Sequence, residues 1–117
     1  MNRPLGPYSP LVASGGWLVV SGQLGVDGDG RLVGGGAAAE LTQAISNMRG
    51  LLAGEGATLG DVVKTTLFLA DMGDFAAVNE AYVEAFGTHR PARSAVGVAG
   101  LPMGARVEIE AWARAAL

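Results

Sequence analysis

Three consecutive segments with different hydrophobic periods constrain the fold most strongly. Between the glycine triplet at 34–36 and Gly54 or Gly56, apolar side chains recur at helical spacing. This stripe contains Leu41, Ile45, Met48 and Leu52. Residues 61–71, DVVKTTLFLAD, are rich in β-branched side chains and predict a strand. Asp74 is a suitable N-cap for a second helix, DFAAVNEAYVEAFG, whose apolar face carries Phe75, Val78, Tyr82 and Phe86.

Further strands are expected on both sides of these segments. The stretch YSPLVASGGWLVVSG predicts two strands joined by Gly15-Gly16, because both positions of a tight hairpin turn need positive φ. VDGDG at 26–30 predicts a second turn, and two more strands follow near 92–99 and 106–114. The order ββ(β)αβαββ predicts an α+β fold. We expect one domain spanning 1–117, with a mixed sheet of about six strands and both helices on one face.

Two helices are too few to cover both faces of such a sheet. Only 16% of the residues are charged, whereas 50% are apolar. This proportion of charge is low for so small a domain, and it indicates that another copy of the chain covers some of the apolar surface. The sequence therefore predicts a homo-oligomer.

Composition disfavours several classes of function. The net charge is −3, with eight Lys and Arg residues and no basic cluster, which disfavours a nucleic-acid partner. No cysteine is present and His89 is the single histidine, so a metal site is not expected. Residues 4–26 carry no charge, but their prolines and glycines are unfavourable in a membrane-spanning helix. We expect a soluble, cytoplasmic protein.

Several polar residues have both a structural and a functional interpretation. His89 is better explained as an exposed loop residue than as part of a Ser-His-Asp triad. Asn79 lies on the apolar arc of the second helix, where its amide either bonds a strand or lines a pocket. Glu108 and Glu110 share one face of the last strand, an arrangement typical of a solvated face. Arg93 either pairs with one of these glutamates or binds an anion.

Five stretches taken together resemble the RidA family, also called YjgF, of small reactive-imine deaminases. They are GPYSP at 6–10, VVSGQLGV at 19–26, DVVKTTLFLADMGDFAAVNEAY at 61–82, RPARSAVGVAGLP at 90–102 and ARVEIEAWA at 105–113. The resemblance implies a chorismate-mutase-like fold assembled as a homotrimer, in which three sheets form a central barrel with clefts between subunits. It also implies hydrolysis of 2-imino acids, or their 2-enamine tautomers, to 2-keto acids and ammonia.

The same resemblance implies the residues of the site. Arg93 corresponds to the arginine that binds the substrate carboxylate, and Glu108 to the acid that holds the attacking water. The other substrate-binding positions correspond to Tyr8, Ser21, Asn79 and Ala95. Many members of the family have a cysteine in place of Ala95. A protonated imine is already electrophilic, so this chemistry needs neither a metal nor a cofactor.

Two other functions are compatible with these residues. The clefts of a trimer could bind 2-keto acids or other small carboxylates without turnover, and Arg93 alone would suffice for that role. A ribonuclease or translation inhibitor is a label often attached to the family. The acidic net charge and the single histidine count against this label, since RNA cleavage uses acid–base groups and cations that bind phosphate.

Overall fold

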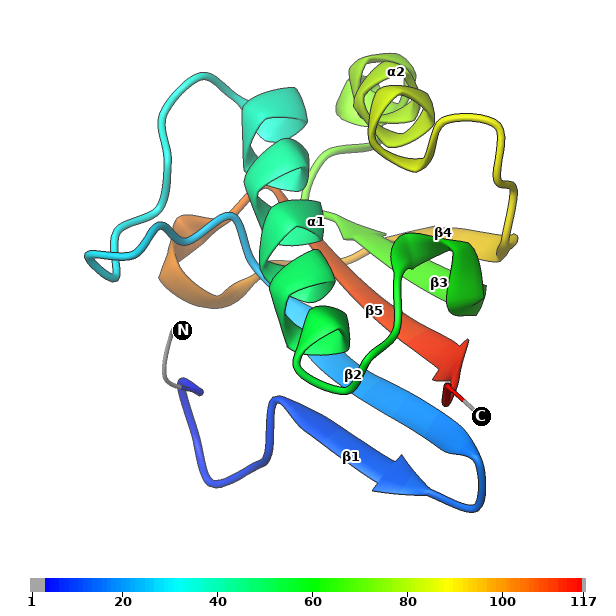
Figure 1. Cartoon of the computed structure of the whole chain (residues 1–117). Coiled ribbons are helices and arrows are strands. Elements are labelled where there is room, and N and C mark those ends of the chain that lie inside the picture. The colour runs from blue at the N-terminus through cyan, green and yellow to red at the C-terminus, as the bar shows by residue number, and fades with distance from the viewer. Residues whose placement is uncertain (1–3, 117) are drawn as a thin grey trace.

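The computed structural model describes residues 4–116 and shows two helices packed against one open sheet (Figure 1). The helices are α1 (Ala37–Ala53) and α2 (Phe75–Phe86). The strands are β1 (Leu11–Ser14), β2 (Trp17–Gln23), β3 (Val62–Leu69), β4 (Ala92–Gly97) and β5 (Val107–Arg114). Their order in the sheet is β1-β2-β5-β3-β4, with β3 and β4 parallel and the other pairs antiparallel. The α+β fold and the mixed sheet predicted from the sequence are confirmed.

The described sheet has five strands, where about six were expected. After β2 the chain forms only an isolated bridge between Val26 and Leu32. In the turn between them, Asp27 Oδ1 accepts hydrogen bonds from the N–H groups of Asp29 at 2.9 Å and Arg31 at 3.0 Å. A side chain that bonds nearby backbone in this way competes with the hydrogen bonds of a strand ladder. VDGDG is therefore the turn that was predicted, but it joins no extra strand.

The first hairpin agrees with its prediction. Gly15 and Gly16 have φ angles of 59° and 83°, and they connect β1 to β2 in antiparallel register. Residues with a side chain rarely adopt such backbone angles, so the glycine pair lets the chain reverse direction here at low energetic cost. This turn places the edge strand β1 beside β2, and the segment before β1 lies near the end of β2 (Figure 1).

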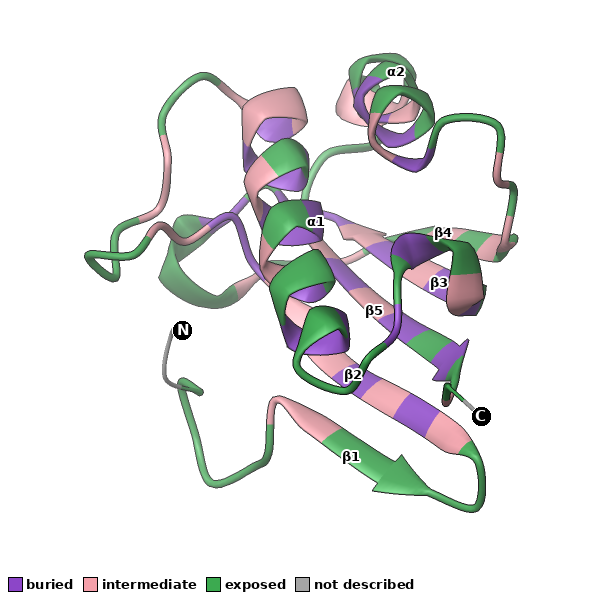
Figure 2. Cartoon of the chain, in the orientation of Figure 1, coloured by how far each residue is buried: buried purple, intermediate pink, exposed green. Residues whose placement is uncertain are grey.

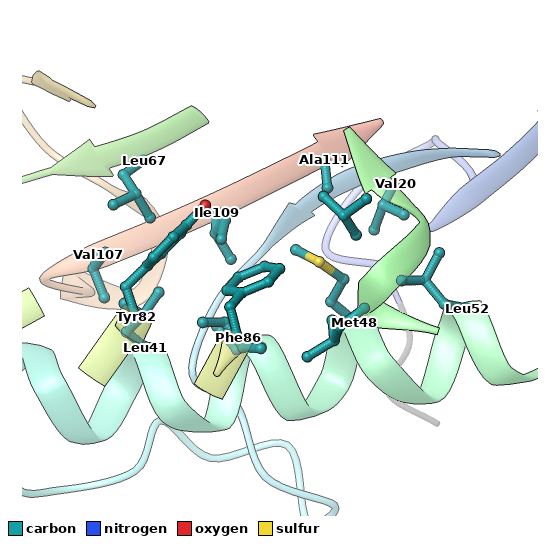
Figure 3. Close-up of a cluster of buried hydrophobic side chains, with 14 of the residues drawn as sticks. Val20, Leu41, Met48, Leu52, Leu67, Tyr82, Phe86, Val107, Ile109 and Ala111 are labelled. Carbon is teal, nitrogen blue, oxygen red and sulfur yellow. The ribbon is translucent and has the colours of Figure 1, made fainter. Parts of the chain in front are cut away.

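The hydrophobic core lies between the helices and one face of the sheet (Figure 3). The predicted stripe of α1 is confirmed, since Leu41, Ile45, Met48 and Leu52 are all buried. On α2, Val78, Tyr82 and Phe86 are buried, whereas Phe75 is only partly covered. The sheet contributes alternate side chains, which on β5 are Val107, Ile109, Ala111 and Ala113. Burying one face of each element is what holds the two layers together.

The start of α2 differs from the expected cap. Asp74 occupies the N-cap position, but its side chain makes no capping hydrogen bond. The chain instead enters α2 through a short 3₁₀ turn, Met72–Asp74, in which Asp71 Oδ1 accepts from Gly73 N–H at 2.8 Å. The extra turn moves the side-chain cap three residues upstream, so the prediction identified the helix start correctly and the capping group wrongly.

The opposite face of the sheet has no helix over it. Along β5 the buried residues alternate with Glu108, Glu110 and the exposed Trp112, as predicted, and Figure 2 shows this alternation. Val12 of β1 and Val96 of β4 are large apolar side chains exposed on the same face. We call this surface the bare face. Among residues 4–116, no helix is long and apolar enough to cross a membrane.

Candidate active site

A hollow of about 670 Å³ opens where the N-terminal segment passes the end of β2 and the start of β5. Its walls comprise residues 4–8, Pro10, 21–24, Val26, Asn47, Pro102, Glu108 and Glu110. These residues come from both ends of the chain and from α1. The fold therefore gathers in one place three of the predicted site residues, which are Tyr8, Ser21 and Glu108.

Glu108 is the most informative group of the hollow. It is half-buried, and burial raises the pKa of its carboxyl group, with the negative charge of Glu110 as a smaller cause in the same direction. Its carboxylate lies directly over Gly22 of β2. A Cβ atom on Gly22 would lie 2.7 Å from Glu108 Cδ and closer still to Oε2. Gly22 is therefore required by the close approach of the glutamate.

Two hydrogen bonds hold the N-terminal segment against β2. Ser21 Oγ donates to the Ser9 carbonyl at 2.6 Å, and Ser21 N–H donates to the Pro10 carbonyl at 2.9 Å. Tyr8 directly precedes this anchor, is exposed, and accepts from Leu5 N–H at 3.3 Å through its hydroxyl group. Ser21 thus holds in place the N-terminal segment that carries Tyr8.

Arg93 lies on β4 beside the second helix. Its guanidinium carbon is 4.9 Å from the centre of the Tyr82 ring and 5.6 Å from that of Phe75. Burial raises the pKa of Tyr82, although its hydrogen bond to Thr65 and the positive charge of Arg93 act in the opposite direction. Within the described residues, Arg93 has no ion pair with a carboxylate. The structural alternative, a pair with Glu108 or Glu110, is not formed in the chain.

Asn79 and Ala95 accompany Arg93. Asn79 is half-buried on α2, as its position on the apolar arc predicted, and its Oδ1 is buried without a hydrogen-bond partner in residues 4–116. The proposed bond from this oxygen to a strand is therefore absent. Ala95 follows Arg93 by two positions on β4, so both side chains point to the same face of the sheet.

Strand pairing shows that Arg93 and Glu108 face opposite sides of the sheet. Thr65 of β3 is buried on the helix side, where its Oγ1 lies 2.8 Å from the Tyr82 hydroxyl, and its register partner on β4 is Arg93. Glu108 is paired with Phe68, which is three positions further along β3 and so points to the bare face. Tyr8, Ser21 and Glu108 form one group, which we call the glutamate half-site. Asn79, Arg93 and Ala95 form the other, the arginine half-site.

Some residues of this arrangement were not predicted. Glycine inside a strand, as in VSGQ, is a known mark of close approach and could have identified Gly22. The aromatic rings beneath Arg93 were assigned only to the core, because helical periodicity does not distinguish a core ring from one that also contacts a cation. His89 lies in a loop, as predicted, but the expected exposure was wrong, since the residue is half-buried and its Nε2 lies 2.7 Å from the Val62 carbonyl.

The fold and the site define a small α+β protein whose polar site residues are divided between the two faces of one sheet. The chain belongs to the endoribonuclease L-PSP family, also called RidA or YjgF, since the family model matches residues 1–115. The 2-iminobutanoate/2-iminopropanoate deaminase of Homo sapiens is 48% identical over 110 residues, which are 93% of this chain and 80% of that protein.

Solved structures give the same assignment. The yjgF gene product of E. coli superposes with a TM-score of 0.89 at 39% identity, over 95% of this chain and 90% of that one. E. coli TdcF with bound serine superposes with a TM-score of 0.90 at 33% identity, over 97% of this chain and 91% of that one. The predicted family membership is thus confirmed along almost the whole chain.

Proposed function

We propose that this protein is a hydrolytic deaminase that converts 2-imino acids, or their 2-enamine tautomers, to 2-keto acids and ammonia. Identity of 48% to a deaminase of 2-iminobutanoate and 2-iminopropanoate supports the reaction class. The observation that carries the proposal is the pair of half-sites. One offers a cation with no anionic partner in the described chain, and the other offers a half-buried carboxyl group with a raised pKa.

The two half-sites face opposite sides of the sheet, so we place the complete site between copies of the chain. A homotrimer would cover the bare face, where Val12, Val96 and Trp112 are exposed, and would bring the arginine half-site of one copy to the glutamate half-site of the next. Three such clefts would then form in each assembly. This arrangement is the trimeric barrel expected from the family.

Arg93 binds the substrate carboxylate in this mechanism. A guanidinium group can hold a carboxylate through two parallel hydrogen bonds, which fixes the neighbouring imine carbon in position. The guanidinium carbon lies over the Tyr82 and Phe75 rings, and within the described residues no carboxylate occupies its N–H groups. Asn79 Oδ1, which has no partner in the described chain, can accept a hydrogen bond from the imine N–H group.

Glu108 positions water and transfers protons. In its ionised form the carboxylate takes a proton from water as the oxygen bonds to the C=N carbon of the protonated imine, which gives a neutral carbinolamine. Glu108 then gives this proton to the amino nitrogen and takes the proton of the new hydroxyl group as the C–N bond breaks and the C=O bond forms. The ammonia that leaves carries the remaining proton away as ammonium. A raised pKa suits both steps, because the group must hold the proton between them. No metal or cofactor takes part in this sequence.

Turnover in a coupled assay tests the function. An amino-acid oxidase generates an imine, semicarbazide competes for it, and the enzyme suppresses formation of the semicarbazone. We expect Glu108→Gln to lose about 100-fold or more in kcat and still bind a 2-keto acid, because the carboxylate acts in the reaction. Arg93→Ala should lose both turnover and binding.

Two exposed residues provide matched controls. Arg49→Ala removes a cation from α1, and Glu84→Gln removes a carboxylate from α2, both away from the half-sites. Both variants should behave as wild type. If wild type fails with imines derived from alanine, 2-aminobutyrate and leucine but binds the keto acids, the protein is a carboxylate-binding module instead.

Light scattering tests the assembly. We expect a mass of three chains, each of 11.8 kDa. Mixing Arg93→Ala with Glu108→Gln chains should restore partial activity, since a cleft that takes Arg93 from one copy and Glu108 from the other is intact. A monomeric protein, or no complementation after the subunits have exchanged, would contradict the shared cleft.

A further inference from the structure

Glu40 is a buried carboxylate that the proposed reaction does not use. It is 3% exposed, and in the described part of the chain Thr65 is the only other polar residue that is buried. Glu40 lies in the first turn of α1, where the helix dipole favours a negative charge. A polar side chain is costly to bury without hydrogen-bond partners, so the contacts of Glu40 need an explanation.

The side chain of Glu40 contacts Arg106, the residue just before the strand that carries Glu108. Glu40 Oε1 accepts a hydrogen bond from Arg106 N–H at 2.8 Å, across a sequence separation of 66 residues. The carbonyl of Arg106 accepts from Ala70 N–H at 3.0 Å, just beyond β3. Both peptide groups of Arg106 are therefore held, one by α1 and the other by β3. Glu108 stands two residues further along β5.

The turn before Arg106 makes this attachment important. Met103 has a φ angle of 62° and Gly104 one of 69°, and Met103 is the only described residue other than glycine with positive φ. Such a conformation is strained for a side chain with Cβ and persists only when its surroundings hold it. Pro102 opens this turn and forms one wall of the hollow. A shift of the turn would therefore move a wall as well as the strand.

The backbone of Glu40 fixes a second wall. A Cβ atom on Gly25 would lie 2.5 Å from the Glu40 carbonyl oxygen and 2.6 Å from its Cα, so the loop after β2 packs directly on this turn of α1. Its neighbours Leu24 and Val26 line the hollow. Two turns further along α1, Asn47 Nδ2 donates to the carbonyls of Leu24 at 3.1 Å and Val26 at 2.9 Å.

We infer that Glu40 is a positioning residue for deamination, which sets the place of the Glu108 carboxylate by holding the Arg106 peptide against α1. This role rests on the proposed function. Glu40 acts by geometry, because the causes that raise the pKa of Glu108 are burial and Glu110. Arg93 lies on β4 and packs on Tyr82 and Phe75 of α2 rather than on α1, so we expect its position to depend little on this contact.

The test compares two substitutions of similar length. Glu40→Gln keeps an oxygen that accepts from Arg106 N–H, and should retain kcat and KM within about twofold. Glu40→Met removes the acceptor, and kcat should fall about tenfold or more because Glu108 is misplaced. The dissociation constant of a 2-keto acid should change little, since Arg93 remains in place. Unchanged kcat in Glu40→Met, or equal loss of kcat in both variants, would overturn the inference.

A core variant separates positioning from stability. Leu52→Ala removes a fully buried side chain near the other end of α1 and should lower Tm without changing kcat at 25 °C. If Leu52→Ala and Glu40→Met lose kcat in parallel with Tm, Glu40 is merely structural and the inference fails.

Amide NMR gives a result that does not require activity. In Glu40→Met the ¹H–¹⁵N signals of Arg106 and of Gly22, which lies under Glu108, should shift, and the Arg106 amide should lose protection from exchange. Both signals should stay near their wild-type positions in Glu40→Gln. Static signals in Glu40→Met would refute the positioning role even if the protein proved to be no deaminase.

Discussion

The two half-sites are built by different means. Arg93 is held by side chains, since Tyr82 and Phe75 from α2 contact its guanidinium, and Tyr82 is itself fixed by Thr65. Glu108 is held by backbone, since it lies on Gly22 and its strand is anchored through the Arg106 peptide. A site supported by several side chains should lose activity gradually as these side chains are shortened by substitution. A site that depends on close approach of a side chain to the backbone should lose most of its activity when a single methyl group is added to that backbone.

The largest effect should follow Gly22→Ala. The added Cβ would overlap the Glu108 carboxylate, which must rotate or move away. We expect kcat to fall about 100-fold, since a shift of about 1 Å in a reacting group has that effect. Steady-state kinetics give the result, and Gly28→Ala is the control, because nothing lies within 4 Å of a Cβ at Gly28. Wild-type kcat in Gly22→Ala would show that the contact with Glu108 is not needed.

Tyr82→Phe should change stability without changing binding. The variant removes a hydroxyl group 2.8 Å from Thr65 Oγ1 and leaves the buried threonine unpaired. This should cost about 1–3 kcal/mol in the free energy of unfolding, measured with urea. The ring remains below Arg93, so the dissociation constant of a 2-keto acid should not change. Adding Thr65→Val should recover part of the lost stability, and a loss of affinity in Tyr82→Phe would show that the hydroxyl group itself supports Arg93.

Phe75→Leu should weaken binding slightly. The Phe75 ring centre is 5.6 Å from the Arg93 guanidinium carbon, and an exposed cation–π contact contributes about 0.5–1 kcal/mol. Affinity for a 2-keto acid should therefore fall about two- to fivefold by calorimetry. Phe75→Tyr keeps the ring and should bind as wild type. Complete loss of binding in Phe75→Leu would mean that the arginine half-site is as sensitive as the glutamate half-site.

The smallest effect concerns pH. Burial and the charge of Glu110 both raise the pKa of Glu108, and in the proposed mechanism Glu108 must be ionised to accept a proton from water. Activity should therefore decline as pH falls through this raised pKa. Glu110→Gln removes the smaller cause, so the acid limb of the kcat/KM profile should move to lower pH, while Glu84→Gln leaves it in place. A limb that moves to higher pH in Glu110→Gln would contradict this assignment.

Local patterns predicted most of the fold. The apolar stripe of α1 and the alternation along β5 were predicted correctly, because each pattern shows which side of a single helix or strand is apolar. That side is buried whichever other element packs against it. The capping side chain of α2 was assigned wrongly, because a 3₁₀ turn inserted before the helix gave Asp71 that role. The additional strand was also wrong, since side-chain bonds from Asp27 made a closed turn that a pattern of turn residues does not reveal.

In the candidate site, too, features that depend on neighbouring residues were predicted from the sequence, whereas features that depend on distant segments were not. The family motifs predicted Arg93 and Glu108 as site residues, and strand alternation gave the face of β5 that carries the glutamate. Alternation within β4 alone did not give the face that carries Arg93, because that depends on the parallel pairing of Thr65 with Arg93 and on α2 above them. Glu40 could not be identified from sequence as a partner of β5, since 66 residues separate it from Arg106.

The sequence by itself therefore determined the helices, most strands, the apolar side of each, the family, and the residue types available for acid–base and carboxylate chemistry. Only the tertiary structure decided that the described sheet runs β1-β2-β5-β3-β4, that Gly22 makes room for Glu108, and that Arg93 and Glu108 point to opposite faces. The physical reason is the sequence separation over which each contact acts. Periodicity depends on residues that are close in sequence. Strand order, close backbone approach and the face to which a side chain points depend on contacts between distant segments, which form together only in the folded chain.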